Sequence, residues 1–197
     1  MRPPMKPLAD ALADLLAQAT PLAGTDTVST FDADGRVLQT AAVSPLQVPP
    51  QDNSAMDGYA VRCADVAAAG AVLPVSQRIP AGSLGTPLAA GTAARIFTGA
   101  PLPEGADAIV MQEDCEALDE GRSVRVNAVP AAHQWIRRAG EDIALGAQVL
   151  AAGTRLTPAA LGLAASIGLG RLDVARRPRV ALFSTGDELA MPGEVPP

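Results

Sequence analysis

The sequence has few of the side chains from which most metal centres and covalent active sites are built. Its 197 residues include one histidine and two cysteines. Cys63 and Cys115 form no CxxC pair, so neither a zinc site nor a disulfide framework is indicated. His133 stands alone, which excludes a site with several histidine ligands, and no GxSxG or cysteine motif accompanies it. Lys6, the one lysine, lies outside any GxxxxGK[ST] phosphate loop.

Long apolar runs and net positive charge are missing as well. No apolar run approaches the roughly 18 residues of a membrane span. Asp10 and Asp14 interrupt the N-terminal stretch, so we expect no signal peptide and a cytoplasmic location. The net charge is −6 and the pI is near 4.7, which argues against nucleic-acid or membrane partners. The available donors are carboxylates, hydroxyls, arginine and backbone N–H groups, which suit Mg²⁺ and oxyanions.

The N-terminal flank of the chain predicts two helical segments. Leucines recur at helical spacing at positions 8, 12, 15 and 16, and Gly24 is placed to stop that helix. Ser29 is placed to cap a second, short helix with Asp32 at its third position. The residues that follow, RVLQTAAV, predict an extended segment.

The segment from about residue 146 to 178 predicts a hairpin, a helix and another extended stretch. GAQVLAAGTRL is typical of a hairpin with its turn at Ala152-Gly153. The helix that follows has Thr157 as N-cap, Pro158 at its first position and Gly168 just beyond its end. RLDVARRP then predicts an extended segment.

Between about residues 48 and 140 the pattern is that of a β-rich domain. Short alternating or apolar runs are separated by clusters of Pro, Gly, Asn and Asp. The runs are YAVRCADV, AVLPVSQRI, AARIFTG, DAIVMQED, SVRVNAV and QWIRRAG. Their number and length predict a small barrel-like or coiled sheet.

The last stretch of the chain predicts the start of another domain. Val180–Phe183 is continuously apolar, as in a strand buried on both faces of a parallel sheet, and STGDEL follows as in a strand-to-helix turn. Such a strand needs neighbours, so we expect the chain to be cut inside its next domain. The alternative is that Val180–Phe183 joins an edge of the β-rich domain. The expected fold is mixed α+β and β-rich, with a helical/extended unit at 1–47 plus 141–176, a β-rich domain at 48–140 and the start of an α/β domain at 177–197.

Two oxygen-rich stretches lie within the predicted β-rich domain. In VPPQDNSAMDGYAV, Asp57-Gly58 before an alternating run is a strong hairpin signal. Turn chemistry does not explain the four residues gathered before it, Asp52, Asn53, Ser54 and Met56. In RIFTGAPLPEGADAIVMQED, the hydroxyl of Thr98 and neighbouring N–H groups are placed to form an anion cradle, although Thr98-Gly99 also fits an ordinary turn.

Two further oxygen-rich stretches follow. In IRRAGEDIALG, a glycine separates Arg137 and Arg138 from Glu141 and Asp142, which fits a phosphate and metal loop or a solvated hairpin with local ion pairs. In FSTGDEL, hydroxyls and a glycine precede a predicted helix N-terminus, where N–H groups favour anions. The two acids at that point fit either a bridging divalent cation or simple helix capping.

In this order the stretches DNSAMDGYAV, RIFTGAPLPEGADAIVMQED, AGEDI and PRVALFSTGDEL resemble the molybdopterin molybdenumtransferases, the MoeA family related to the gephyrin E domain. The similarity extends from about residue 48 to 190. It implies insertion of molybdenum from molybdate into adenylylated molybdopterin, with Mg²⁺-assisted release of AMP. It also implies a cytosolic homodimer whose active site lies between the β-rich domain of one subunit and the α/β domain of the other.

The resemblance also implies roles for particular residues. Asp57, Thr98, Asp142 and Glu188 would be catalytic; Ser184, Thr185 and Gly186 would bind the phosphate end of the pterin; Asp57, Asp187 and Glu188 would hold the metal. Members of the family are about twice as long as this chain, so we expect it to be an N-terminal part that does not catalyse alone. The alternative function is a non-catalytic dimerisation or scaffold module of the gephyrin type. Tungsten in place of molybdenum stays open, because both oxyanions need the same donors.

Overall fold

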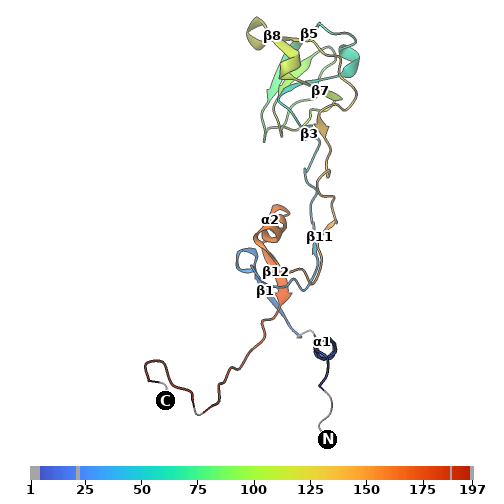
Figure 1. Ribbon diagram of the computed structural model, residues 1–197. Helices are drawn as coiled ribbons and strands as arrows, with labels where there is room; N and C mark the ends of the chain where they lie inside the picture. The colour runs from blue at the N-terminus through green and yellow to red at the C-terminus, as the bar shows by residue number, and fades with distance from the viewer. Residues whose placement is uncertain (1–4, 21–22, 187, 196–197) are drawn as a thin grey trace.

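The computed structural model describes residues 5–20, 23–186 and 188–195. These residues form an elongated molecule, with a β-rich lobe at one end, a narrow neck, and a smaller lobe from which the C-terminal tail departs (Figure 1). The predicted class, β-rich with few helices and a curled sheet, is confirmed. No helix in the described ranges is long and apolar enough to cross a lipid bilayer.

The β lobe contains a six-stranded sheet with the strand order β7-β4-β6-β5-β9-β8. The strands are β4 (Gly58–Val61), β5 (Ala71–Ile79), β6 (Ala93–Ile96), β7 (Ala108–Met111), β8 (Cys115–Leu118) and β9 (Ser123–Val126). The short helices η2 (Cys63–Asp65), η3 (Gln112–Asp114) and η4 (Asp119–Gly121) connect them. The long strand β5 pairs with β9 through its first half and in parallel with β6 through its second half, with a register shift between Val75 and Gln77. That shift lets one strand serve both parts of the curled sheet.

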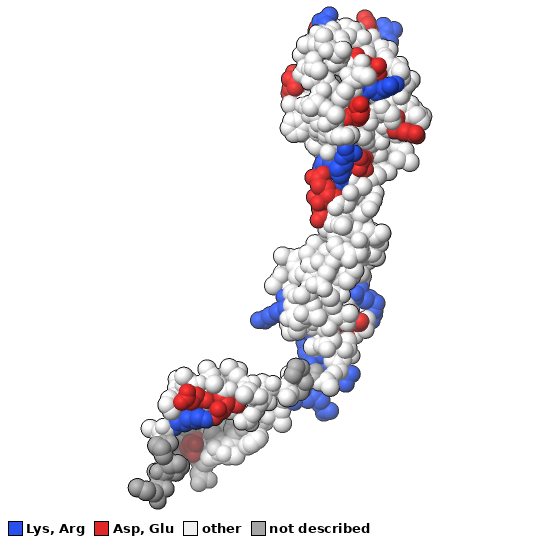
Figure 2. Space-filling model, turned by 90° about the vertical axis from the view of Figure 1, so that its right-hand side faces the viewer, with Lys and Arg blue, Asp and Glu red and all other residues white. Residues whose placement is uncertain are grey.

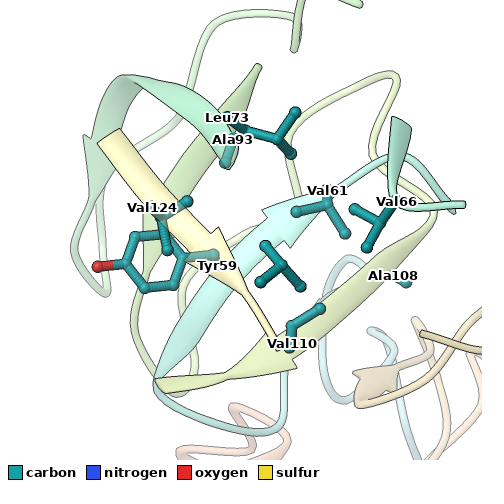
Figure 3. Packing of buried hydrophobic residues seen from close by; sticks show 9 residues of the cluster. Tyr59, Val61, Val66, Leu73, Ala93, Ala108, Val110 and Val124 are labelled. Carbon is teal, nitrogen blue, oxygen red and sulfur yellow. The ribbon is translucent and has the colours of Figure 1, made fainter. Parts of the chain in front are cut away.

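Both faces of the sheet are covered, because successive side chains of a strand point to opposite faces. On one face Tyr59 and Val61 of β4 pack with Val110 of β7 and Val124 of β9 (Figure 3). On the other face Ala60 packs in a second cluster that includes Ile79, Leu88, Ala94, Ile96 and Ile109. All four residues of β4 are buried. The central strands therefore hold the polar loops at their ends in fixed positions.

The neck consists of two antiparallel segments, residues 42–54 and 136–150. Near the smaller lobe β2 (Ala42–Val43) pairs with β11 (Gln148–Leu150), and near the β lobe β3 (Asn53–Ser54) pairs with β10 (Ile136–Arg137). Val48 and Ile143 form a bridge between them. The chain thus enters and leaves the β lobe through the same narrow connection.

The smaller lobe, residues 23–41 and 151–176, is built on β1 (Thr25–Ser29) and β12 (Arg171–Ala175), paired antiparallel. It also contains η1 (Thr30–Asp32) and α2 (Pro158–Ser166). Ser29 caps η1, accepting a hydrogen bond from the Phe31 N–H, as predicted. The N-cap of α2 is also confirmed: the Thr157 hydroxyl accepts from the Ala160 N–H at 3.3 Å. A buried cluster centred on Leu38, Leu156 and Val174 holds the lobe together.

The first helix, α1 (Leu8–Ala17), forms as predicted but buries no residue. It ends at Ala17, before the predicted stop at Gly24. Its four leucines are all exposed, Leu8 at 85% and Leu12 at 52%. The amphipathic pattern is therefore present, but the apolar face has no partner among the residues that the structure describes.

Outside the candidate site, the predicted hairpin at 146–156 and the predicted strand at 180–183 differ from the structure. The turn at Ala152-Gly153 forms, but its arms do not pair with each other: β11 pairs with β2, and Arg155 bridges to Val37. Residues 180–183 form no strand and join no sheet edge, and Phe183 is 83% exposed. A strand with apolar side chains on both faces needs two covering layers and a paired neighbour, and the described residues supply neither. The division of the chain into three domains at 47, 141 and 177 stays a prediction.

Candidate functional site

The segment from Asp52 to Gly58 is not the hairpin that its Asp-Gly pair predicts. β3, which precedes Asp57, pairs with β10, whereas β4, which follows it, pairs with β6 and β7. Asp57 therefore lies at a bend between two sheets. Gly58 is required by space, because a Cβ at this position would overlap the carbonyl oxygen of Val110.

Two of the predicted stretches lie side by side through main-chain hydrogen bonds. The N–H of Gly99 donates to the Ser54 carbonyl at 2.8 Å, and the N–H of Ser54 donates to the Ala100 carbonyl at 2.9 Å. The Leu102 N–H donates to the Asp52 carbonyl at 2.9 Å. The residues before Asp57 are thus fixed against the loop that begins at Thr98.

The side chains of Asp57 and Thr98 meet at this junction. Oδ1 of Asp57 accepts two hydrogen bonds from Thr98, one from the backbone N–H and one from the hydroxyl, each 2.8 Å long. The backbone N–H of Thr98 is the main reason that the pKa of Asp57 lies below its ordinary value; the hydroxyl and the nearby Arg95 act in the same direction. The result is a carboxylate that stays charged and is fixed at one oxygen. No residue that the structure describes hydrogen-bonds its other oxygen.

Three residues that sequence reasoning missed surround this pair. The Gln112 N–H donates to the Asp57 carbonyl at 3.0 Å. Arg95 donates to the Gly58 carbonyl at 2.8 Å and to Oε1 of Gln112 at 2.6 Å, and its guanidinium lies 4.5 Å from the centre of the Phe97 ring. The alternation in ARIFTG was the available signal, because extended chain places Arg95 of β6 and Phe97, which follows the strand, on the same side just before Thr98.

The third predicted stretch forms an ion-pair cluster at the neck, where acidic and basic side chains gather below the β lobe (Figure 2). Asp52 accepts from the Ala139 N–H at 2.8 Å and from Arg138 at 2.6 Å. The Ala139 N–H is the main reason that the pKa of Asp52 is lowered. Arg137 contacts both carboxylate oxygens of Asp142 at 2.5 Å. Among the described residues, the Asp142 side chain forms its hydrogen bonds and its ion pair with Arg137. It does not contact Asp57 or Thr98 in this way.

The fourth predicted stretch lies in the exposed C-terminal tail. All four described residues of this stretch are exposed: Ser184, Thr185, Gly186 and Glu188. The predicted strand before them and the predicted helix after them do not form in the described residues. Asp187 lies outside the described residues. Figure 1 places this tail beyond the smaller lobe, at the opposite end of the molecule from the β lobe. Within a single chain, these residues are therefore far from Asp57.

The described residues contain no group of three or more His, Cys, Asp or Glu side chains that could hold a metal ion. Burial is the main cause that raises the pKa of the thiols of Cys63 and Cys115 to about 11, which makes them poor thiolate ligands and nucleophiles. The free oxygen of Asp57 is a single hard donor. The predicted roles of Asp57, Asp187 and Glu188 as metal ligands stay predictions.

A strained loop borders the Asp57 segment. His133 and Trp135 have φ values of 65° and 56°, in the left-handed region that non-glycine residues avoid. The Ala55 N–H donates to the Trp135 carbonyl at 2.9 Å. His133 is thus a loop residue that contributes backbone geometry next to the site.

An open pocket of about 680 Å³ lies in the smaller lobe and not at the Asp57–Thr98 pair. It is lined by residues 35–39, 152–153 and 175–178. None of the residues predicted to act in catalysis or binding lines it, so its size alone does not make it the functional site.

Comparisons with known proteins agree with this arrangement of motifs. Residues 6–168 match the family model described as the MoeA N-terminal region, domains I and II. The chain is 49% identical over 172 residues to molybdopterin molybdenumtransferase 2 of Mycobacterium tuberculosis, and 40% identical over 192 residues to molybdopterin molybdenumtransferase of Nostoc. Those alignments cover 85% and 95% of this chain but 42% and 44% of the relatives.

Solved structures give the same match. The crystal structure of a molybdopterin biosynthesis MoeA protein from Pyrococcus horikoshii superposes with a TM-score of 0.82 at 32% identity, covering 97% of this chain and 49% of that one. A second structure of the protein from that organism gives 0.79 at 33% identity. The chain therefore spans less than half the length of these relatives.

Proposed function

Because this chain belongs to the family of the MoeA N-terminal region, we propose that it is the N-terminal part of a molybdopterin molybdenumtransferase. It would act in molybdenum cofactor biosynthesis, where the complete protein inserts molybdenum from molybdate into adenylylated molybdopterin and releases AMP. This chain would supply the part of the active site that surrounds Asp57 and Thr98. The same proposal gives catalytic roles to Asp142 and Glu188. It assigns binding of the phosphate end of the pterin to Ser184, Thr185 and Gly186.

The observation that carries the proposal is the double hydrogen bond from Thr98 to Asp57. Two residues 41 positions apart are held together by the fold, although Asp57 needs no such partner to make a turn. The enzymatic function predicts that Asp57, Thr98 and Asp142 converge, whereas the scaffold alternative predicts their dispersal with Asp57 engaged only in its own turn. Asp57 and Thr98 are in contact, whereas the side chain of Asp142 binds Arg137 in the neck. A charged, fixed carboxylate with one free oxygen favours the enzymatic reading.

Asp57 would act in the reaction through its free oxygen. Held at Oδ1 by Thr98, the carboxylate presents the other oxygen in a fixed direction without losing its charge. It could then accept a proton from an attacking water or contribute one ligand to a Mg²⁺ ion, which is usually held by one or two carboxylates and by substrate phosphate oxygens. When bound, such an ion would stabilise the negative charge that develops on the pyrophosphate bond.

A homodimer is part of the proposal, as is a cytoplasmic location. The tail with Ser184 to Glu188 lies at the far end of the molecule from the β lobe (Figure 1). A second subunit placed in the opposite direction would bring its own tail region to the first subunit's Asp57. The completed site would then contain residues from both chains.

The test is a single-turnover assay of AMP release from adenylylated molybdopterin in the presence of molybdate. We expect release by the complete protein and none by the 197-residue chain alone. Turnover by this chain at the rate of the complete protein would contradict the proposed half-site. Absence of AMP release by the complete protein would contradict the proposed reaction itself.

A further inference from the structure

Two arginine side chains share one aromatic ring beside Thr98. The guanidinium carbon of Arg78 lies 4.7 Å from the centre of the Phe97 ring, and that of Arg95 lies 4.5 Å from it. Arg95 is also 5.2 Å from the centre of the Tyr59 ring. The pairing of β5 with β6 explains this arrangement, because Arg78 and Arg95 are register partners in the parallel ladder and therefore lie on the same face.

The two guanidinium groups differ in how their donors are used. Arg95 donates to the carbonyls of Gly58 and Ile96 and to the side chain of Gln112, so its position is fixed from several sides. Arg78 makes no side-chain hydrogen bond and no ion pair with any residue in the described ranges. Its five N–H donors are free for a ligand, while the ring restricts where the guanidinium can lie.

The arrangement is electrostatically incomplete without an anion. Two positive groups that contact one ring repel each other, and stacking on the ring offsets only part of that cost. The carboxylate of Asp57 accepts hydrogen bonds from Thr98, and Arg95 helps to lower its pKa, but neither Asp57 nor any other carboxylate in the described residues forms an ion pair with Arg78. A planar guanidinium with free donors and a neighbouring positive charge is suited to bind a phosphate-like group through paired hydrogen bonds.

We propose that Arg78 and Arg95, stacked on Phe97, form a binding site for a tetrahedral oxyanion at the edge of the β lobe next to Thr98. Arg78 supplies the free donors, Phe97 fixes its plane, and Arg95 adds charge while it also supports Gly58. The ligand is a phosphate ester or a free tetrahedral oxyanion such as molybdate, since both have the same charge pattern. This site stands apart from the proposed role of Asp57, and either assignment can fail without the other.

The first experiment uses the unmodified chain. Phenylglyoxal modifies accessible arginines, and peptide mapping by mass spectrometry measures the extent at each position. Inorganic phosphate should protect Arg78 severalfold and leave Arg155 unchanged, because Arg155 is an exposed arginine of the smaller lobe with no aromatic ring beside it. Equal protection by chloride at the same ionic strength, or equal protection of Arg155, would contradict the site.

Separate titrations with AMP and with molybdate distinguish the two sources of the oxyanion. Protection by AMP at a lower concentration than by molybdate assigns the site to a phosphate ester, and the reverse order assigns it to a free oxyanion. Protection by neither, together with none by phosphate, overturns the proposal.

Variants give a second, independent readout. Arg78→Gln should weaken phosphate binding about tenfold, the effect expected for the loss of charge-assisted hydrogen bonds. Phe97→Leu should weaken it in the same direction, whereas Arg155→Gln, with the same change in net charge, should leave it unchanged. Binding is followed by the amide shift of Thr98 in NMR titrations, and thermal unfolding confirms that each variant is folded. Wild-type affinity in folded Arg78→Gln would contradict the proposal.

Discussion

The carboxylate of Asp57 and the backbone and hydroxyl of Thr98 form one unit, in which a single carboxylate oxygen accepts two 2.8 Å hydrogen bonds. The unit depends on the close packing of two loops, since Gly99 and Ala100 bind the main chain of Ser54 at the same point. Thr98 therefore fixes the direction of the Asp57 carboxylate and lowers its pKa. The predictions below test these two effects and the local structure that supports them.

Removal of the Thr98 hydroxyl should raise the pKa of Asp57. Folding favours the charged form of this carboxyl, because its folded pKa lies below the ordinary value of 3.8. Its contribution to stability is present above that value and is lost as the pH falls through the folded pKa. In Thr98→Ala the backbone N–H remains, so the pKa should rise only part of the way towards 3.8. Carboxyl-detected NMR titration measures this.

Asp26 is the internal reference for that titration, because its pKa is lowered mainly by a hydrogen bond from Arg36 in the smaller lobe. It should titrate identically in the wild type and in Thr98→Ala. A shift of Asp26 together with Asp57 would indicate a global change, and an unchanged Asp57 would contradict the role given to the hydroxyl.

Gly58→Ala should destabilise the β lobe. The added methyl group would overlap the carbonyl oxygen of Val110, and both lie in paired strands that cannot move apart without loss of hydrogen bonds. Overpacking of this kind costs about 1–3 kcal/mol. Urea unfolding followed by Tyr59 and Trp135 fluorescence measures the change.

The matched control is Gly162→Ala in α2, where the added methyl group meets no atom within 4 Å. Alanine is the better helix former, so this variant should be more stable by about 0.5–1 kcal/mol. If Gly58→Ala were as stable as Gly162→Ala, the close approach of β4 and β7 would not be as described.

Thr157→Ala should weaken the start of α2. The hydroxyl is the cap of this helix, and loss of a cap costs about 1 kcal/mol. Thr157→Ser keeps the oxygen and should restore most of the stability. The Ala160 N–H donates to the Thr157 hydroxyl, so its hydrogen-exchange rate is the most local measure of the cap. Equal exchange rates in the Ala and Ser variants would contradict the capping role.

Local structure was predictable where one short signal decides it. Thr157, Pro158 and Gly168 mark both ends of α2, and the structure forms the helix between them. The alternating runs gave most strands of the sheet, although β8 was missed because CEAL carries little β propensity.

Long-range pairing was not predictable from these signals. The Asp57-Gly58 pair indicates a hairpin, but tertiary pairing directs β3 and β4 to different partners. The parallel pairing of β5 with β6, which brings Arg78 next to Arg95, joins segments whose sequences say nothing of each other. The apolar run Val180–Phe183 has a strand pattern but finds no neighbour, and pattern alone does not supply one.

The candidate site shows the same limit. Asp57 and Thr98 were each selected from sequence, and their contact came from the fold. Asp142 was selected in the same way, yet its side chain binds Arg137 in the neck. Arg78 and Phe97 were not selected, because neither belongs to a recognisable motif and only the fold brings them into contact.

The central claim is that the Asp57 carboxylate, held by Thr98, acts in the reaction of the complete protein. It is tested most directly by the rate of AMP release in Asp57→Asn. Asn keeps the size of the side chain and an oxygen that can accept from Thr98, so thermal unfolding should change little. The matched control is Asp173→Asn, which alters another half-buried carboxylate that accepts from a threonine hydroxyl, that of Thr27 at 2.6 Å. The account predicts a loss of at least about 100-fold for Asp57→Asn and none for Asp173→Asn; full activity in Asp57→Asn would contradict it.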